Sequence, residues 1–337
     1  MINVNFASLF KRPLSFFAPA INWSPVTRLI IATVISILAI TAFLTLNVRA
    51  SWAFTLPFRG EKVIAIILVG VAIAFSTVLF QTLTHNRILT PGIMGFDAFY
   101  MLLQSLMLLG LGRIAFVQFH PQLKWLIEVF LMTGALCGLY YWLFLRQKRD
   151  LPVLILVGIV LGVLFRSLNS LIGRMMDPVE FDVLQDFMFA SFNRIDGSLL
   201  GIAGSLMLFV SVWLWRQRYL LDVLQLGDDV AINLGLNRRS LTLKLIMAIA
   251  FLVSVSTALV GPVTFFGILV ANLAYAVCGS HQHRFVIPMA ALLAIITLVG
   301  GQAILEYVLK FGTSLSIVVE FVGGVFFLIL VMRQGRR

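Results

Sequence analysis

Ionisable residues interrupt several long apolar runs of this sequence. Asp97, Glu128, Arg166 and Glu320 each fall within such a run, where a lone charge at mid-membrane depth costs at least about 2.5 kcal/mol. Charged residues at such positions line a water-filled path, take part in a proton relay, or pair with a residue of a neighbouring helix. Asp97 and Glu320 lie near the starts of their runs, which favours an ordinary position at a span end. For Glu128 and Arg166 both interpretations stay open, and a salt bridge between neighbouring helices would satisfy either residue.

The other chemically active residue types give little support to catalysis. His281 and His283 form an HxH pair in a short loop, but the sequence beside them offers no set of ligands that would complete a metal site, so a solvated loop is expected. Cys137 and Cys278 lie within apolar runs and are interpreted as small apolar fillers. The sequence contains no GxxxxGKS/T, GxSxG or HExxH motif. We therefore expect no enzyme, metal site or cofactor in this chain. If the chain serves a process that ATP powers, such as transport, a separate subunit must hydrolyse the ATP.

Composition places these residues in a membrane protein. Of the 337 residues, 61% are hydrophobic and 12% are charged, and the mean hydropathy is +1.03. Soluble domains carry about 45–50% apolar and about 25% charged residues, so a soluble enzyme, a nucleic-acid-binding domain and a single-span receptor are excluded. The net charge of +11 is attributed to cationic residues that flank the spans on the cytoplasmic side rather than to a nucleic-acid partner.

The apolar runs predict an all-α polytopic membrane protein with about ten transmembrane helices. At about 20 residues per crossing, the runs fall at 29–46, 63–83, 93–112, 125–145, 151–171, 197–215, 245–262, 264–279, 285–307 and 316–332. Only Gly261 and Pro262 separate the seventh run from the eighth. Because transmembrane helices tolerate these residue types, one broken helix is the alternative there.

Both ends of the chain are expected in the cytoplasm. With that topology, sixteen basic residues lie on the cytoplasmic side and eight outside, with Arg166 inside a span, which obeys the positive-inside rule. Residues 1–28 are expected to form a cytoplasmic N-terminal segment that is not a secretory signal. This segment either lies flat at the membrane interface or forms a disordered tail. Residues 29–337 would then form a single transmembrane domain.

A short cytoplasmic segment between the sixth and seventh spans carries a helix signature. Asp228 or Asp229 can cap a helix start, and Gly235 can end the helix in the left-handed conformation. Leu226, Val230 and Leu234 would form one apolar stripe. Two turns of helix are not stable alone in water, so the segment must dock against something. Composition alone leaves open whether this is another molecule or the ends of its own membrane helices.

This segment resembles the coupling helix of the iron-siderophore and cobalamin ABC importer permease family, the type II importers. The family pattern is L-G-D/E-x-x-A-x-x-L-G-L/V, and its fixed positions are met by Leu226, Gly227, Asp228, Ala231, Leu234, Gly235 and Leu236. The resemblance covers about residues 55–337. It implies the type II permease fold, N-in and C-in, in a bacterial inner (cytoplasmic) membrane.

Two further stretches carry the resemblance. QTLTHNRILTPGIMG at 81–95 is similar to the family's Q-x-L-x-x-N-P-L-A-x-P-x-x-L-G, although Arg87 replaces a proline. Gly261-Pro262 through Gly267 resembles the turn that enters the family's eighth helix, after which Ala271 and Asn272 depart from the usual proline and histidine. The string NRILTPGIMGFDAFY resembles one subunit type of paired permeases for catecholate siderophores of the vibriobactin, anguibactin and petrobactin kind.

The resemblance implies a set of partners. Two ATP-binding subunits would bind ATP and Mg²⁺, and a second permease chain, homologous but different, would complete the pore. A substrate-binding protein would deliver the ferric siderophore, and membrane lipid would surround the spans. Contact with the ATPase is implied for Leu226, Gly227, Asp228, Asp229, Val230, Ala231, Leu234 and Gly235.

The resemblance also implies two sites on the outer side. The family's two basic residues that meet the binding protein correspond by position to Arg59 and Lys62, whose alternative role is to anchor the span at the interface. A third family arginine corresponds to Glu306, and Lys310 is the alternative that could substitute for it. The outer gate helix corresponds to Phe181 to Phe192, with an acidic solvated loop as the alternative. The helical spacing of its apolar residues favours the gate; these are Phe181, Leu184, Phe187, Met188 and Phe192.

Two other functions compete with the importer. A proton- or sodium-driven secondary transporter would need inverted repeats and facing ionisable groups near the midplane, and it would not need the capped segment at 226–236. A weak internal repeat, AFSTVLF at 74–80 and SVSTALV at 254–260, is compatible with both the importer and the secondary transporter. A membrane-embedded enzyme would need clustered carboxylates or metal ligands, and the sequence shows no such cluster.

Overall fold

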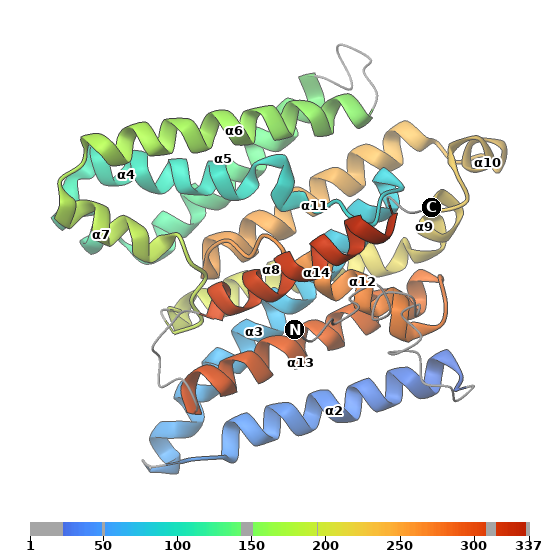
Figure 1. Ribbon diagram of the computed structural model, residues 1–337, viewed down its shortest axis with the longest axis horizontal. Coiled ribbons are helices and arrows are strands. Elements are labelled where there is room, and N and C mark those ends of the chain that lie inside the picture. The colour runs from blue at the N-terminus through green and yellow to red at the C-terminus, as the bar shows by residue number, and fades with distance from the viewer. Residues whose placement is uncertain (1–22, 49–50, 143–150, 194, 308–314, 335–337) are drawn as a thin grey trace, which may run out of the picture.

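The computed structural model describes residues 23–48, 51–142, 151–193, 195–307 and 315–334. Within these ranges the secondary structure is helical, with thirteen α-helices and one 3₁₀ helix (Figure 1). In chain order these are α2 (Pro25–Thr45), α3 (Trp52–Thr84), η2 (Pro91–Met94), α4 (Phe96–Gln118), α5 (Pro121–Tyr140), α6 (Leu151–Met175), α7 (Pro178–Phe187), α8 (Gly197–Arg216), α9 (Arg218–Leu224), α10 (Asp228–Asn233), α11 (Arg238–Val260), α12 (Phe266–Cys278), α13 (His283–Tyr307) and α14 (Leu315–Gln334).

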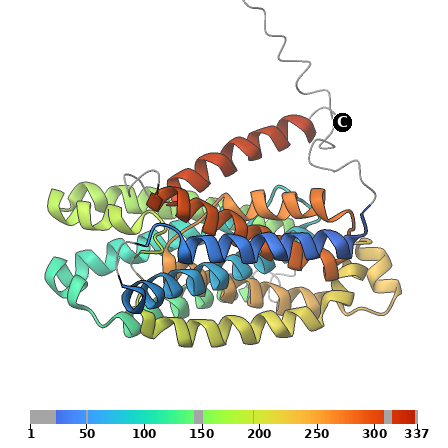
Figure 2. The same ribbon diagram turned by 90° about the horizontal axis from the view of Figure 1, so that it is seen from below.

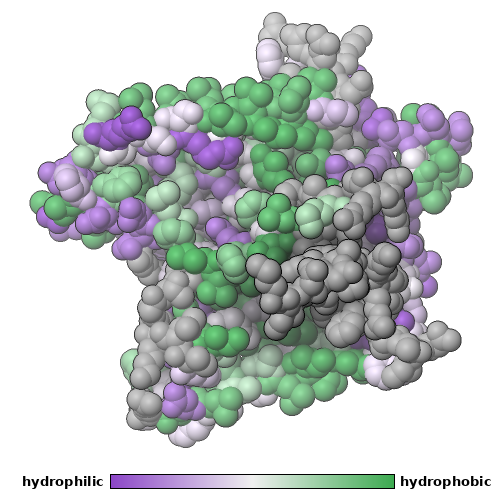
Figure 3. Space-filling model, viewed as in Figure 1, coloured by the Kyte–Doolittle hydropathy of each residue, from purple (hydrophilic) through white to green (hydrophobic). Residues whose placement is uncertain are grey.

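Each of the ten expected spans is found as a helix. Among the described residues, eight helices are long and apolar enough to cross a membrane, and α12 and α14 contribute shorter apolar stretches. Apolar side chains gather along the sides of the bundle, whereas hydrophilic ones gather at its two ends, over α7 and over α10 (Figure 3). The exposed apolar residues include Ile30, Phe130 and Phe209. This surface suits a bilayer, and the chain is a multi-pass membrane protein.

The first span begins earlier than the sequence suggested. Ser24 caps α2 by accepting a hydrogen bond from the backbone N–H of Thr27, and Pro25 occupies the first turn, where its missing N–H costs nothing. Residues 25–28, which were expected to belong to the N-terminal segment, are therefore helical. Residues 1–22 lie outside the described part of the chain.

The seventh and eighth spans are separate helices, as the sequence division predicted. Gly261 follows α11 with φ +98°, and a Cβ atom placed there would lie 3.0 Å from the Cα of Ala190. The backbone N–H of Ser191 donates to the carbonyl oxygen of Val260 at 2.8 Å. The chain therefore bends at Gly261 because another backbone segment passes directly against it, and α12 starts only at Phe266.

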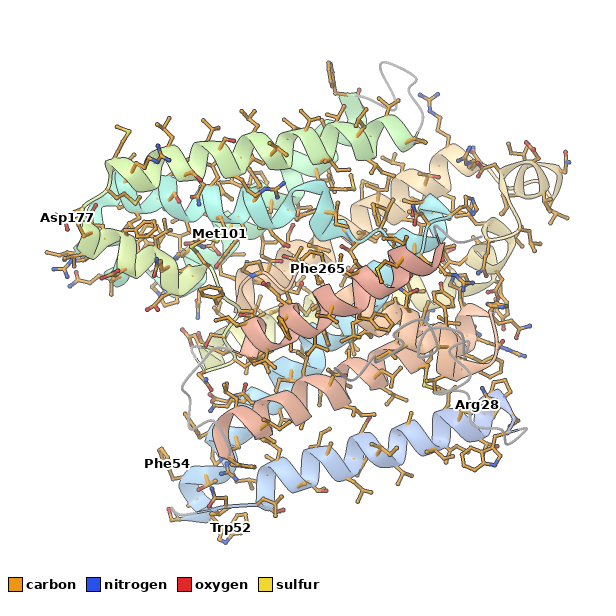
Figure 4. The ribbon with its side chains drawn as sticks, in the orientation of Figure 1. Arg28, Trp52, Phe54, Met101, Asp177 and Phe265 are labelled. Carbon is orange, nitrogen blue, oxygen red and sulfur yellow. The ribbon has the colours of Figure 1, made fainter. Side chains whose placement is uncertain are left out.

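The two described ends of the chain lie on the same side of the bundle. Arg28, near the start of α2, lies at the end of the molecule that carries α9 and α10, whereas Trp52, Phe54 and Asp177 lie at the opposite end (Figure 4). The last helix, α14, starts against the bundle, tilts away from it and ends on the α10 side (Figures 1 and 2). This agrees with an even number of crossings. We call the α10 side cytoplasmic and the α7 side outer, following the positive-inside assignment.

The centre of the bundle is built around α3. This helix packs against α13, α11, α8 and α12, and most of its residues from Val63 to Leu83 are buried. Gly70 of α3 lets α13 approach closely, since an added Cβ would lie 3.3 Å from the Cβ of Ala294. α3 and α13 thus form a tightly packed antiparallel pair that runs through the molecule.

Candidate functional site

The 226–236 segment folds as a short helix held between two glycines. α10 covers Asp228–Asn233 and is preceded by α9. Gly235 has φ +82°, which confirms the predicted left-handed stop. The predicted cap is wrong: Gly227 is the N-cap, and Asp228 and Asp229 lie in the first turn instead. Their negative charges still face the positive end of the helix dipole.

The apolar stripe of this segment points away from the rest of the chain. Leu226, Val230 and Leu234 are 65%, 41% and 62% exposed, whereas Ala231 on the opposite face is fully buried. The alternative in which the stripe packs on its own membrane helices therefore does not describe this structure. A cluster of exposed apolar side chains at the cytoplasmic end, beyond the membrane-facing surface, is typical of a protein-binding surface.

Two exposed side-chain contacts connect α10 to two membrane helices. The Oδ2 of Asp228 lies 2.7 Å from the Nη2 of Arg238, at the start of α11. Its Oδ1 lies 3.7 Å from the Nε2 of His85, at the end of α3. The side chains in both pairs are about one-third exposed, and pairs of this kind contribute only about 0–1 kcal/mol. They orient α10 without fixing it strongly.

A buried histidine fixes α9, the helix that leads into α10. His283 is fully buried, which corrects the expectation that the HxH pair forms a solvated loop. Its backbone N–H and its Nδ1 both lie 2.7 Å from the Oδ1 of Asp222 on α9, and its Nε2 lies 2.7 Å from the Oγ1 of Thr82 on α3. His281, by contrast, is exposed, with its Nδ1 3.4 Å from the Nη2 of Arg87. Local sequence patterns do not indicate this cluster, because its members lie 61 and 201 residues from His283.

On the outer side, Arg59 and Lys62 share α3 but are directed into the fold. The Nη1 of Arg59 donates to the carbonyl oxygens of Phe43 at 3.1 Å and Leu46 at 2.7 Å, at the end of α2. The Nζ of Lys62 lies 2.7 Å from the Oε1 of Glu306, and the two side chains are 5% and 8% exposed. Both cations therefore have partners within this chain, and a role in docking stays a prediction that requires them to be released.

The outer helix that corresponds to the expected gate is α7. Asp177 caps it by accepting from the backbone N–H of Val179 at 2.9 Å. The helix begins at Pro178 and ends at Phe187, so the expected range of 181–192 is wrong at both ends. Met188 is the C-cap residue, and Phe192 is buried in the non-helical stretch that follows. That stretch must leave the helical path because it carries Ala190 against Gly261.

One lysine connects α7 to the bundle. The Nζ of Lys124, on α5, lies 3.8 Å from the ring centroid of Phe116 and 4.1 Å from that of Phe187. The two rings meet edge to face with centroids 5.4 Å apart. Leu184 and Phe181 complete the inner side of α7, Leu184 fully buried and Phe181 half-buried against Gly173.

A cavity of about 360 Å³ lies beneath α7, between α4, α5, α8 and α11. Its polar lining includes Lys124, Asp186 and Glu128. The Oε1 of Glu128 accepts a hydrogen bond from the Nε2 of Gln104 at 2.7 Å. Glu128 is thus satisfied inside the bundle by a neighbouring helix, and it lines a cavity at the outer side.

A smaller polar pocket of about 30 Å³ lies between α3, α11 and the turn that precedes α12. The Oδ2 of Asp97 accepts from the Oγ1 of Thr264 at 2.6 Å on its rim, and Arg166 and Glu320 lie within electrostatic reach of Asp97. The two stretches of the weak internal repeat meet here, since the lining includes the hydroxyl residues Ser76, Thr77, Ser256 and Thr257. The pocket has room for about one water molecule.

Comparison with known proteins agrees with this architecture. The FecCD transport family matches residues 16–333. The petrobactin import system permease protein YclO of Bacillus subtilis is 43% identical over 286 residues, which cover 85% of this chain and 91% of that protein. The petrobactin import system permease protein FatC of Bacillus anthracis is 32% identical over 276 residues, covering 82% and 78%.

A solved structure supports the same fold. An inward-facing conformation of a metal-chelate type ABC transporter superposes with a TM-score of 0.80, at 20% sequence identity, over 92% of this chain and 99% of that chain. At this level of identity the similarity concerns the fold alone.

Proposed function

Because this chain belongs to the FecCD transport family, we propose that it is the permease subunit of an ATP-binding cassette importer that moves a ferric siderophore into the cytoplasm. The observation that carries this proposal is the exposed apolar stripe of α10, whose side chains face away from the bundle. A separate motor subunit would cover that stripe. A secondary transporter driven by protons or sodium has no need of such a surface and is not favoured.

The relatives support an iron-siderophore cargo. Two of the similar permeases, at 43% and 32% identity, are named for petrobactin import. The cargo of this chain would accordingly be a ferric siderophore, of the catecholate class that the string NRILTPGIMGFDAFY suggested.

The complete importer would contain several chains. Two nucleotide-binding subunits would hold ATP and Mg²⁺, because this sequence has no phosphate-binding loop of its own. A second permease chain would complete the pore, and a binding protein would dock at the outer side. The assembly would lie in the bacterial inner (cytoplasmic) membrane, with α10 in the cytoplasm.

This chain would convert motion of the motor into motion of its gates. ATP-driven closure of the partner subunits would displace α10 through Leu226, Val230 and Leu234, and α9 would carry this displacement into the bundle. On the outer side, α7 would open or close the path above the cavity that Glu128 and Lys124 line. Docking of a binding protein at Arg59 and Lys62 would require Lys62 to exchange Glu306 for a carboxylate of that protein.

Uptake of a labelled ferric siderophore tests the proposal. A strain that lacks this chain should lose uptake of ferric petrobactin, and the restored gene should recover it. In membrane vesicles loaded with ATP, uptake should continue when a protonophore collapses the proton gradient, and it should stop when the partner ATPase cannot hydrolyse ATP. Uptake that follows the proton or sodium gradient instead would favour the secondary transporter.

A further inference from the structure

Three elements meet at the buried side chain of His283. This residue opens α13, while its hydrogen-bond partners Asp222 and Thr82 belong to α9 and to the last turns of α3. We name these three residues the Asp222 cluster. α9 ends directly before the turn at Gly227 that starts α10. The Asp222 cluster is therefore the place where the segment that carries α10 is joined to the central helix pair.

The chemistry of the cluster makes this joint stiff. One carboxylate oxygen, the Oδ1 of Asp222, accepts from both the backbone N–H and the ring Nδ1 of His283, so the direction of the carboxylate is fixed by two bonds. The ring cannot rotate without breaking its bond to Thr82. The ring of His283 is fully buried, although the side chain of Asp222 is 29% exposed. Displacing the ring would leave its two nitrogens without hydrogen bonds in a low-dielectric interior. Leu221 and Leu224 on α9 are also buried.

The other connections of α10 are weaker. The pairs of Asp228 with Arg238 and with His85 are about one-third exposed, and exposed pairs of this kind are screened by salt and loosely held. Besides the short backbone link into α11, a force applied to the apolar stripe of α10 would thus enter the bundle through α9 and His283.

The central pair reaches from the Asp222 cluster to the outer surface. α3 and α13 are joined at their cytoplasmic ends by Thr82 and His283 and at their outer ends by Lys62 and Glu306. Along α3, Lys62 and Thr82 are separated by about 30 Å at 1.5 Å per residue, which is the thickness of the hydrocarbon core. Two polar joints at opposite faces of the membrane therefore hold one pair of helices.

We propose that the Asp222 cluster is a positioning element that transmits displacement of α10 to the α3–α13 pair, and through that pair to the outer face where Lys62 and Glu306 lie. This rests on the proposed function, because it needs a motor that moves α10. In this role His283 holds no substrate and no metal. It couples a loaded binding protein outside to ATP hydrolysis inside.

The test uses the complete complex of permeases, ATPase subunits and binding protein in proteoliposomes. Thr82→Val removes only the hydroxyl that joins His283 to α3, and Thr82→Ser keeps it. Asp222→Ala removes the joint to α9. His281→Ala, in the same loop but exposed, is the matched control. The measurements are basal ATP hydrolysis, hydrolysis stimulated by the binding protein, siderophore uptake per ATP, and the melting temperature of the complex.

In Thr82→Val and in Asp222→Ala, basal ATP hydrolysis should be retained. Stimulation by the binding protein and siderophore uptake per ATP should each fall by at least about fivefold, which is the lower end of typical coupling between sites. Thr82→Ser and His281→Ala should behave as the unaltered complex. The double variant should lose no more than the worse single variant, because both changes act through His283.

Two results would decide against the cluster. Full stimulation in both Thr82→Val and Asp222→Ala would overturn the proposal. A loss of stimulation that is matched by equal losses of basal hydrolysis and melting temperature would assign the cluster a purely structural role and would overturn it too. If the unaltered complex shows no ATP-dependent uptake, the proposed function itself fails, which is a different outcome.

Discussion

The ammonium of Lys62 and the carboxylate of Glu306 lie 2.7 Å apart in the outer part of the α3–α13 pair, and the Oε1 of Glu306 also accepts from the Nε2 of Gln302 at 3.0 Å. The sequence resemblance assigned Lys62 to a partner protein and Glu306 to a lost arginine. The structure instead pairs the two residues with each other. An acidic residue at position 306 therefore explains how a lysine is accommodated in the interior of this chain.

Breaking this pair should destabilise the fold. Glu306→Ala leaves the Lys62 ammonium buried without its carboxylate, which typically costs about 3–5 kcal/mol. Thermal unfolding in detergent should show a clear drop in melting temperature. The double variant Lys62→Met, Glu306→Met removes both charges and should unfold close to the unaltered protein. An equally large loss in the double variant would mean that the pair itself, rather than an unpaired charge, sets the stability.

The same pair should control docking of the binding protein. Glu306→Gln keeps the shape of the side chain and removes the negative charge that attracts Lys62. If Lys62 pairs with a carboxylate of the binding protein, association with that protein should become faster. Lys62→Met should make it slower, and the difference should shrink at high salt. Stopped-flow association rates at several salt concentrations measure this. Identical rates for all three proteins would leave Lys62 with an internal role alone.

The apolar stripe of α10 should be required for coupling. Val230→Asp places a charge at the centre of the surface that the motor would cover, where an unpaired buried charge is costly. The assembled complex should lose uptake while its ATPase keeps its basal rate. Val230→Leu keeps the surface apolar and is the matched control. Normal uptake in Val230→Asp would show that the stripe of α10 is not the surface on which the motor acts.

Gly261 should not tolerate a side chain. Its φ of +98° and the 3.0 Å approach of the Ala190 Cα to an added Cβ mean that Gly261→Ala adds both strain and a clash with backbone. With ψ 176° its backbone lies in a region that essentially only glycine adopts, and such conformations cost another residue about 1–3 kcal/mol. Gly110→Ala, where an added Cβ meets nothing within 4 Å, is the control. Melting temperatures of the two variants should differ, with only Gly261→Ala lowered.

The sequence predicted the features that depend on neighbouring residues. Hydropathy located the ten spans, and the position of Gly235 predicted the end of α10, because both are local properties. The sequence could not predict the Asp222 cluster, since His283 is separated from Asp222 by 61 residues and from Thr82 by 201. No spacing rule connects such positions.

Two other differences have physical causes in the packing. The expected gate helix stops at Phe187 because the chain must turn to bring Ala190 against Gly261. Arg59 was expected at the surface, yet its guanidinium donates to carbonyl oxygens at the end of α2, where the last backbone carbonyls have no partner within the helix. Helix ends and long side chains near the membrane interface are thus where local patterns are least informative.

Lys124 should restrain the outer helix α7. Its ammonium contacts both Phe116 and Phe187, and a cation–π contact contributes about 0.5–1 kcal/mol when exposed and about 2 kcal/mol when desolvated. Lys124→Met removes the charge and should increase the motion of α7, whereas Lys124→Arg should preserve the restraint. A spin label at Asp182→Cys, on the exposed side of α7, reports this motion once Cys137 and Cys278 have been replaced. The label should gain mobility in Lys124→Met alone. Equal mobility in the methionine and arginine variants would show that apolar packing of Leu184 and Phe187 holds α7 without help from the charge.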